Sequence, residues 1–294
     1  MKKFSRKIYY AINILVLLIA IAVLIYHVIC NIEIMELNIS KILSIVIFYI
    51  IINFFKYIKM YLIFLDEKIP FIEFLTLYMK TTFASIAIPF KLGEIFSIYC
   101  YGYKIKNYKK GFIGILVNRF IDTIILLAFM IPTEMSTNNL KITTTSAILL
   151  TFVLAFLIFL IIMPATYKYL NKYLVMSKPS KTNVALLGIL EEVNKIQLES
   201  KKILNGKVYL LILLSSVSWN LEYQLTKILA GVTFNYTTFS TYINAAFFTS
   251  KNGILIEYLI LATTTILILT LITYMVKVIK GRVKNNEKDN LSIW

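Results

Sequence analysis

The stretch IYYAINILVLLIAIAVLIYHVIC, residues 8–30, decides the fold class because it contains no Lys, Arg, Asp or Glu. About 20 consecutive apolar residues are enough for an α-helix to cross the hydrocarbon core of a bilayer. Residues 142–167 and 258–276 are equally free of charged side chains. The first stretch is long for a signal peptide, and no small-x-small cleavage motif follows it. We therefore predict an integral membrane protein that retains its first helix.

The composition of the whole chain supports the same class. Of its 294 residues, 59% are hydrophobic and only 16% are charged, which is more apolar surface than a soluble core of this size buries. The net charge of +16 does not indicate nucleic-acid binding, because Lys and Arg cluster beside the apolar stretches, where they face anionic headgroups.

Specialised chemistry has no signature in the sequence. Cys30 and Cys100 are too few for a disulfide framework and have no metal-ligand spacing. The phosphate-binding pattern Gly-x-x-x-x-Gly-Lys does not occur. We expect no catalytic residue, no metal, no cofactor and no nucleic-acid partner.

Six full membrane spans are predicted, at residues 8–30, 41–65, 111–132, 143–165, 207–231 and 254–276. Lys and Arg concentrate on the cytoplasmic side of membrane proteins. They are dense before the first span, in residues 66–110, in residues 168–207 and after the last span. We therefore expect a multi-pass protein of the cell membrane with both termini in the cytoplasm. Residues 1–276 would form one transmembrane domain, and residues 277–294 a basic cytoplasmic tail.

Two apolar stretches do not fit as full spans. Residues 71–90 have basic residues on both sides, and residues 234–253 have both flanks on the outer side. We predict that each forms a re-entrant or half-crossing hairpin, buried in protein or lining a wet cavity. Hairpins that enter from opposite sides are typical of the inverted repeats of transporters. The predicted fold is thus an all-α polytopic membrane protein with six spans, two hairpins and an inverted repeat.

The segment at residues 167–206 is predicted to contain an amphipathic cytoplasmic helix. Apolar residues recur there at helical spacing, at Val184, Leu187, Leu190, Val193 and Ile196. We interpret the segment as an interfacial connector rather than a partner-binding helix.

Charged residues inside the predicted spans are the first candidates for a site. A charge at the centre of a membrane helix costs about 2.5–3.5 kcal/mol on insertion scales. Arg119 and Asp122 lie three residues apart on one face of the third span, and Glu222 lies midway along the fifth. Each is either part of a structural ion pair or part of a polar site for a lipid headgroup. Lys56 and Lys59 lie toward the inner end of the second span, so we expect them to snorkel to the interface.

The turn at residues 89–94 is the most specific motif. Pro89 interrupts a helix and Gly93 permits a close backbone approach, while Lys91 and Glu94 add charge beside freed backbone N–H groups. Such a turn is either a phosphate contact or an ordinary interfacial turn. The complete set of candidate headgroup-binding residues is Lys80, Pro89, Lys91, Gly93, Glu94, Arg119, Asp122, Glu222, Lys251, Gly253 and Glu257.

These motifs carry a resemblance to a known family. Residues 88–94, IPFKLGE, followed by a basic loop and by NRFID at residues 118–122, resemble the membrane domain of lysylphosphatidylglycerol synthases and their stand-alone flippase-like relatives. That family has a proline–glycine–glutamate turn and then a Glu-Arg-x-x-Asp helix, and Trp219 to Glu222 resembles a Trp-x-x-Glu element of its second half. This sequence departs at Asn118, where the family has glutamate, and at Ser97, where it usually has arginine.

The resemblance implies a protein that moves a lipid, or a lipid-linked intermediate, between leaflets of the cell envelope. Its partners would be membrane lipids, anionic or lipid-linked. The synthases also transfer an aminoacyl group to phosphatidylglycerol, but with a separate soluble domain. Only about 18 residues follow Val276, so we expect none in this chain, and a partner enzyme chain would have to supply that activity. A non-transporting scaffold for envelope assembly is the third alternative.

Overall fold

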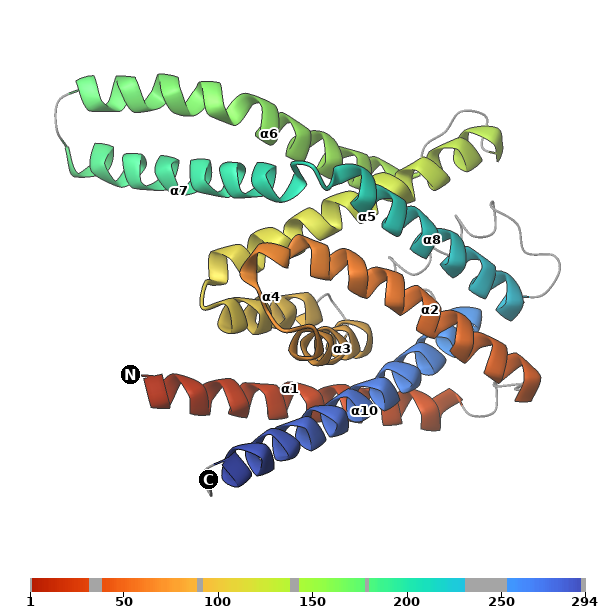
Figure 1. Cartoon of the computed structure of the whole chain (residues 1–294). Coiled ribbons are helices and arrows are strands. Elements are labelled where there is room, and N and C mark those ends of the chain that lie inside the picture. Colours follow the sequence, from red (N-terminus) through yellow and green to blue (C-terminus); the bar gives the residue numbers. More distant parts are fainter. Residues whose placement is uncertain are drawn as a thin grey trace.

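A computed structural model describes residues 2–31, 39–88, 92–137, 143–177, 180–230 and 253–291. These residues are helical apart from short turns and include no strand, which confirms the all-α prediction (Figure 1). The helices are α1 (Lys2–Asn31), α2 (Ile39–Ile63), η2 (Leu65–Glu67), α3 (Phe71–Ala87), α4 (Leu92–Ile105), α5 (Tyr108–Thr137), α6 (Thr144–Met176), α7 (Lys181–Leu204), α8 (Val208–Ala230) and α10 (Gly253–Leu291).

Five helices are long and apolar enough to cross a membrane. Their apolar stretches are Arg6–Cys30, Ile42–Ile63, Tyr108–Pro132, Thr144–Met176 and Ile260–Ile279, each at a predicted span. In the remaining predicted span, at residues 207–231, residues 208–230 form helix α8. This helix carries Asn, Glu, Gln and Lys and is not among the five, so the count of six spans stays a prediction.

The first predicted hairpin, residues 71–90, was wrong in its bounds: residues 71–87 form one helix, α3, which runs antiparallel to α4. Ser85 and Ser97 lie with their hydroxyl oxygens 3.2 Å apart near the turn, and Lys104 forms an ion pair with Glu73 near the open end. The helices have 17 and 14 residues, or about 25 and 21 Å, which is less than a full crossing. Residues 95–105, predicted as part of a basic loop on the cytoplasmic side, belong instead to helix α4.

The second predicted hairpin falls almost wholly outside the described residues. Of residues 234–253, only Gly253 is described, and it begins α10. The inverted repeat therefore stays a prediction. Helix α10 continues to Leu291, so the predicted basic tail is helical over most of its length.

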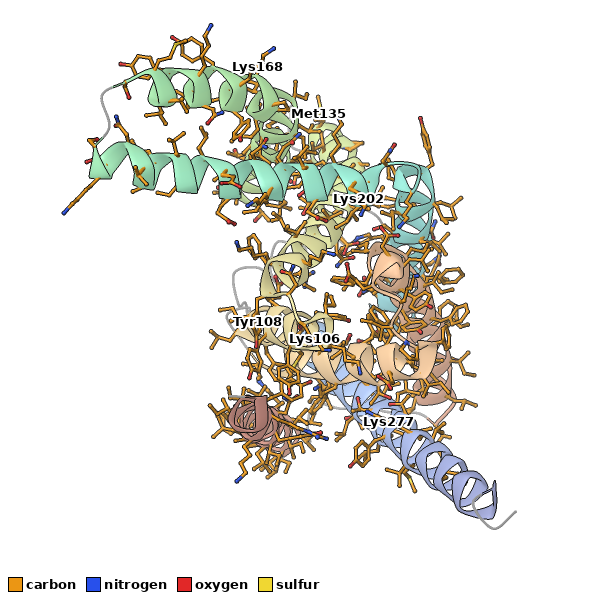
Figure 2. The ribbon with its side chains drawn as sticks, turned by 60° about the vertical axis from the view of Figure 1, so that its left-hand side comes forward. Lys106, Tyr108, Met135, Lys168, Lys202 and Lys277 are labelled. Atoms are coloured by element: carbon orange, nitrogen blue, oxygen red, sulfur yellow. The ribbon has the colours of Figure 1, made fainter. Side chains whose placement is uncertain are left out.

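Helices α6 and α7 form an antiparallel arm that projects from the bundle, with Lys168 on its outer part (Figures 1 and 2). The Gln197 side chain donates a hydrogen bond to the Leu160 carbonyl at 2.9 Å, where the two helices approach the bundle. Within the segment predicted to contain an amphipathic cytoplasmic helix, residues 181–204 form α7, whereas residues 167–176 continue α6. The role of this segment as an interfacial connector stays a prediction. The Lys109 ammonium donates to Glu192 and lowers the pKa of that carboxyl.

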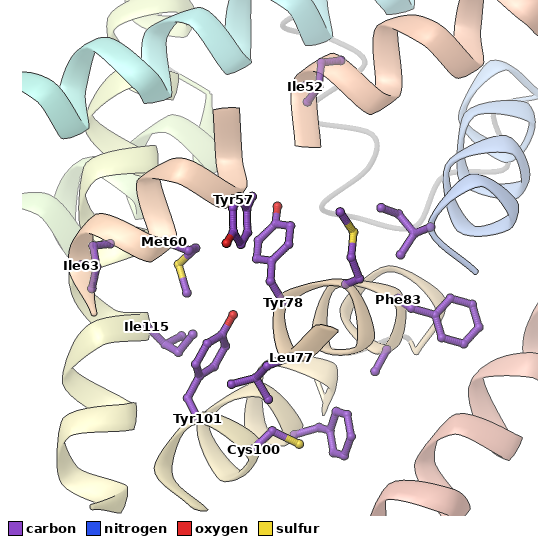
Figure 3. Close-up of a cluster of buried hydrophobic side chains, with 14 of the residues drawn as sticks. Ile52, Tyr57, Met60, Ile63, Leu77, Tyr78, Phe83, Cys100, Tyr101 and Ile115 are labelled. Atoms are coloured by element: carbon purple, nitrogen blue, oxygen red, sulfur yellow. The ribbon is translucent and has the colours of Figure 1, made fainter. Parts of the chain in front are cut away.

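The α3–α4 hairpin lies at the centre of the bundle and packs against α1, α2, α5 and α10. Aromatic side chains fill the contact with α2. The ring centres of Tyr57 and Tyr78 lie 5.6 Å apart (Figure 3). Tyr101 stacks on Phe64, the residue directly after α2, with ring centres 4.9 Å apart. This packing holds the short hairpin against full-length helices, and it positions the polar side chains described next.

Candidate functional site

A polar cavity of about 310 Å³ lies between α2, α3, α4, α5 and α8, and we call it the chamber. Five charged residues contribute to its wall, from three of the helices: Lys56, Lys59, Arg119, Asp122 and Glu222. Hydroxyl and amide side chains of Tyr49, Asn53, Tyr78, Ser85, Tyr101 and Asn118 add further polar groups. The chamber is therefore a polar space between largely apolar helices.

The most deeply buried charge of the chamber is Lys59, whose side chain is 1% exposed. Its ammonium on α2 forms an ion pair with the carboxylate of Asp122 on α5. The hydroxyl of Ser215 on α8 donates to the same carboxylate oxygen at 2.6 Å. One carboxylate thus joins three helices.

A second ion pair joins α2 to α8. The Lys56 ammonium lies 3.1 and 3.2 Å from the two carboxylate oxygens of Glu222. It also lies 5.9 Å from the centre of the Trp219 ring, within the range of a cation–π contact.

A third ion pair lies at the edge of the chamber. Arg119 Nη2 on α5 is 2.9 Å from Glu94 Oε1 on α4, and the Arg119 side chain is 45% exposed. Arg119 and Asp122 therefore do not pair with each other; each finds its partner on another helix. The three pairs together carry three positive and three negative charges, so they balance.

Two buried polar atoms of the chamber wall have no hydrogen-bond partner among the described residues. They are the hydroxyl of Tyr101 and the side-chain oxygen of Asn118. An unpaired buried polar group costs about 1–3 kcal/mol, and such groups usually have a partner. Both atoms are thus available to a polar ligand or to water in the chamber.

The sequence-predicted residues separate into four groups. Arg119, Asp122 and Glu222 line the chamber, and Glu94 lies at its edge. Gly93 is buried in the contact between α3 and α4, where a Cβ atom would lie 2.4 Å from the Ala84 carbonyl oxygen. The chamber thus brings together the candidates from α5 and α8, and Gly93 serves the packing of the hairpin beside it.

Lys80 does not join them, because it contacts α1 instead. Its ammonium donates to the Tyr9 hydroxyl at 3.1 Å and to the side-chain oxygen of Asn13. Pro89, Lys91 and Lys251 lie outside the described residues, Gly253 is described only as the first residue of α10, and the side chain of Glu257 is not described.

Lys56 and Lys59 were not among the candidate site residues predicted from the sequence. The prediction that their side chains snorkel to the membrane interface was wrong. Both turn inward and pair with acids on other helices. The sequence did contain a signal for this pairing. The two lysines lie three residues apart on one helical face, and Asp122 and Glu222 are acids in other spans that need a cation as partner.

A known family describes most of this chain. The model of the family described as lysylphosphatidylglycerol synthase TM region matches residues 8–240. The chain belongs to this family. Searches of curated proteins and of solved structures found no match.

As a member of the lysylphosphatidylglycerol synthase TM region family, the chain is an integral membrane protein. The matched residues include every helix that lines the chamber, from α2 to α8. They also include both motifs on which the resemblance was based. The chamber, with its three ion pairs, therefore lies in the part of the chain that defines the family. Among the described residues, no group of His, Cys, Asp and Glu could hold a metal ion.

Proposed function

We propose that the protein moves a lipid, or a lipid-linked intermediate, between the leaflets of the cell membrane. The observation that carries this proposal is the chamber, which gathers three ion pairs and two unpartnered polar atoms among apolar helices. A lipid headgroup loses its water when it enters hydrocarbon, and it needs replacement polar contacts on the way.

The arrangement of charges suits a headgroup with groups of either sign. Arg119 and Lys56 offer donors to a phosphate, and Glu94 and Glu222 offer acceptors to an amine or a hydroxyl. Each of these charged side chains already has a partner of opposite charge. A headgroup with groups of both signs would replace these partners, so that every charge keeps a partner. The substrate would be an anionic or lipid-linked molecule, and both termini would face the cytoplasm.

The test is lipid movement in vesicles that contain the purified protein. A fluorescent phospholipid in the inner leaflet is protected from dithionite until it moves outward, so the bleached fraction reports translocation. We expect the protein to raise the rate well above that of empty vesicles. Arg119→Gln and Glu222→Gln should each lower it at least tenfold.

The matched control is Glu192→Gln on α7, which removes a carboxylate from an ion pair outside the chamber. This variant should retain the full rate. If the wild-type rate equals that of empty vesicles for neutral, anionic and amino-acid-bearing lipids, the proposal is wrong and a scaffold role is favoured.

The description of the family favours a second candidate, a membrane component of aminoacyl-lipid synthesis that works with a partner enzyme chain. Transfer of an amino acid from aminoacyl-tRNA to phosphatidylglycerol by the purified chain, alone or with a soluble transferase, would support it. The translocase proposal expects no transfer by this chain alone.

A further inference from the structure

A second cavity of about 530 Å³ adjoins the chamber, and we call it the groove. Its wall comes mainly from α5 and α6 and is largely apolar, with Leu116, Leu126, Ile148, Leu149 and Phe152. Arg119, Asp122 and Trp219 line both the groove and the chamber, so the two cavities meet at these side chains.

We propose that the groove holds an acyl chain of a membrane lipid whose headgroup occupies the chamber. This inference rests on the proposed function and adds to it a site for the apolar part of the substrate. An apolar cavity that continues from a polar one matches a molecule with a polar end and a hydrocarbon end. Ile148 at the wall of the groove is 58% exposed, on a face of α6 that would contact the bilayer.

The ion pair of Arg119 with Glu94 marks the junction between the cavities. Glu94 lines the groove and Arg119 lines both spaces, so this guanidinium stands where the polar part of the ligand gives way to its hydrocarbon part. A phospholipid carries its phosphate near that point, and a guanidinium is a suitable donor to phosphate. An apolar membrane helix in the groove would bring no polar end to the chamber.

Trp219 gives a direct test because it lines the groove and the sequence has only one other tryptophan, Trp294. The variant Trp294→Phe leaves Trp219 as the only indole. In vesicles of a phosphatidylcholine with brominated acyl chains, a chain in the groove should quench Trp219 fluorescence through contact with bromine.

The decisive comparison uses variants whose larger side chains fill the groove. On the Trp294→Phe background, Leu149→Phe or Thr123→Phe should reduce this quenching at least twofold, because each adds volume to the groove wall. The control is Leu157→Phe, which lies on the exposed side of α6 outside the groove. It should leave the quenching unchanged.

Quenching that stays the same in both groove variants, while each retains the thermal unfolding midpoint of its parent, would overturn the inference. Quenching reports the presence of an acyl chain in the groove and does not require transport. The experiment therefore distinguishes a failure of the acyl-chain site from a failure of the translocase function. Groove-dependent quenching without lipid movement would contradict only the translocase function. Lipid movement without groove-dependent quenching would contradict only the acyl-chain site.

Discussion

The buried ion pairs show how single residues meet the cost of charge in a membrane. Each cation of the chamber would be expensive alone, at about 2.5–3.5 kcal/mol near the centre of a span. Lys59 meets Asp122, Lys56 meets Glu222, and in each pair the partner comes from a different helix. The charges therefore hold helices together, and the loss of one partner would leave the other uncompensated.

Asp122→Asn should be among the most destabilising substitutions in the chain. It leaves the ammonium of Lys59 buried without an opposite charge, and breaking a buried pair in this way costs about 3–5 kcal/mol. We expect a clear fall in the midpoint of thermal unfolding in detergent micelles, followed by intrinsic fluorescence.

The double variant Lys59→Met with Asp122→Leu serves as the control for that experiment. It removes both charges, and replacement of a buried pair by apolar residues is often neutral. It should therefore unfold at a higher temperature than Asp122→Asn. An Asp122→Asn protein as stable as the wild type would mean that Lys59 is not charged in the folded state.

Among the elements, the α3–α4 hairpin depends on a close approach of two backbones. Gly93 lies against α3 so tightly that an added Cβ atom would be 2.4 Å from both the Ala84 carbonyl oxygen and the Ser85 Cα. These neighbours are backbone atoms and cannot rotate away. The hairpin also supplies part of the chamber wall, including Ser85 and Tyr101.

Gly93→Ala should force the two helices apart, lower the unfolding temperature and impair lipid movement. Gly188→Ala on α7 is the matched control, because a Cβ atom there meets nothing within 4 Å. Alanine is the better helix former by about 1 kcal/mol, so the control should be neutral or slightly stabilising. Equal effects of the two substitutions would contradict the tight contact at Gly93.

Helices could be predicted from the sequence where the pattern that indicates them lies within the helix itself. The charge-free stretches give the spans of α1, α6 and α10, and the helical spacing of apolar residues gives α7. Helix α4 was missed because its mixture of Tyr, Gly and Lys resembles an interfacial segment. It forms a helix in the structure because Phe96, Cys100 and Tyr101 are buried in contact with the rest of the bundle.

The candidate site was only partly predictable, for a similar reason. Arg119, Asp122 and Glu222 stand out because each is a charge in an apolar span. The pairing of Lys59 with Asp122 depends on the packing of α2 against α5, which no single span reveals. A lysine near a helix end can snorkel or turn inward, and only its neighbours in space decide between the two.

At the scale of the whole molecule, the charged ends of the helices gather on one side. The short helix η2, which follows α2, is tied to the start of α5 by Glu67 and Lys110, 2.7 Å apart. It is tied to Lys207, just before α8, by Asp66, 3.3 Å away. The described chain begins and ends on this same side of the bundle (Figure 1). If Lys and Arg mark the cytoplasm, these helix ends face the cytoplasm, and the end of α5 and the start of α6 face the outside.

Cysteine labelling in cells tests this orientation with two exposed positions. Met135 lies near the end of α5, and Lys202 lines a small cavity with Glu67 and Lys110 beside the start of α5, so the two positions mark opposite ends of this helix. In a background of Cys30→Ser and Cys100→Ser, a membrane-impermeant maleimide should label Met135→Cys in intact cells. It should label Lys202→Cys only after permeabilisation. The reverse pattern would place the basic side outside and invert the predicted topology. Equal access at both positions in intact cells would mean that α5 does not cross the bilayer, and a chamber built on α5 could not then serve transport between leaflets.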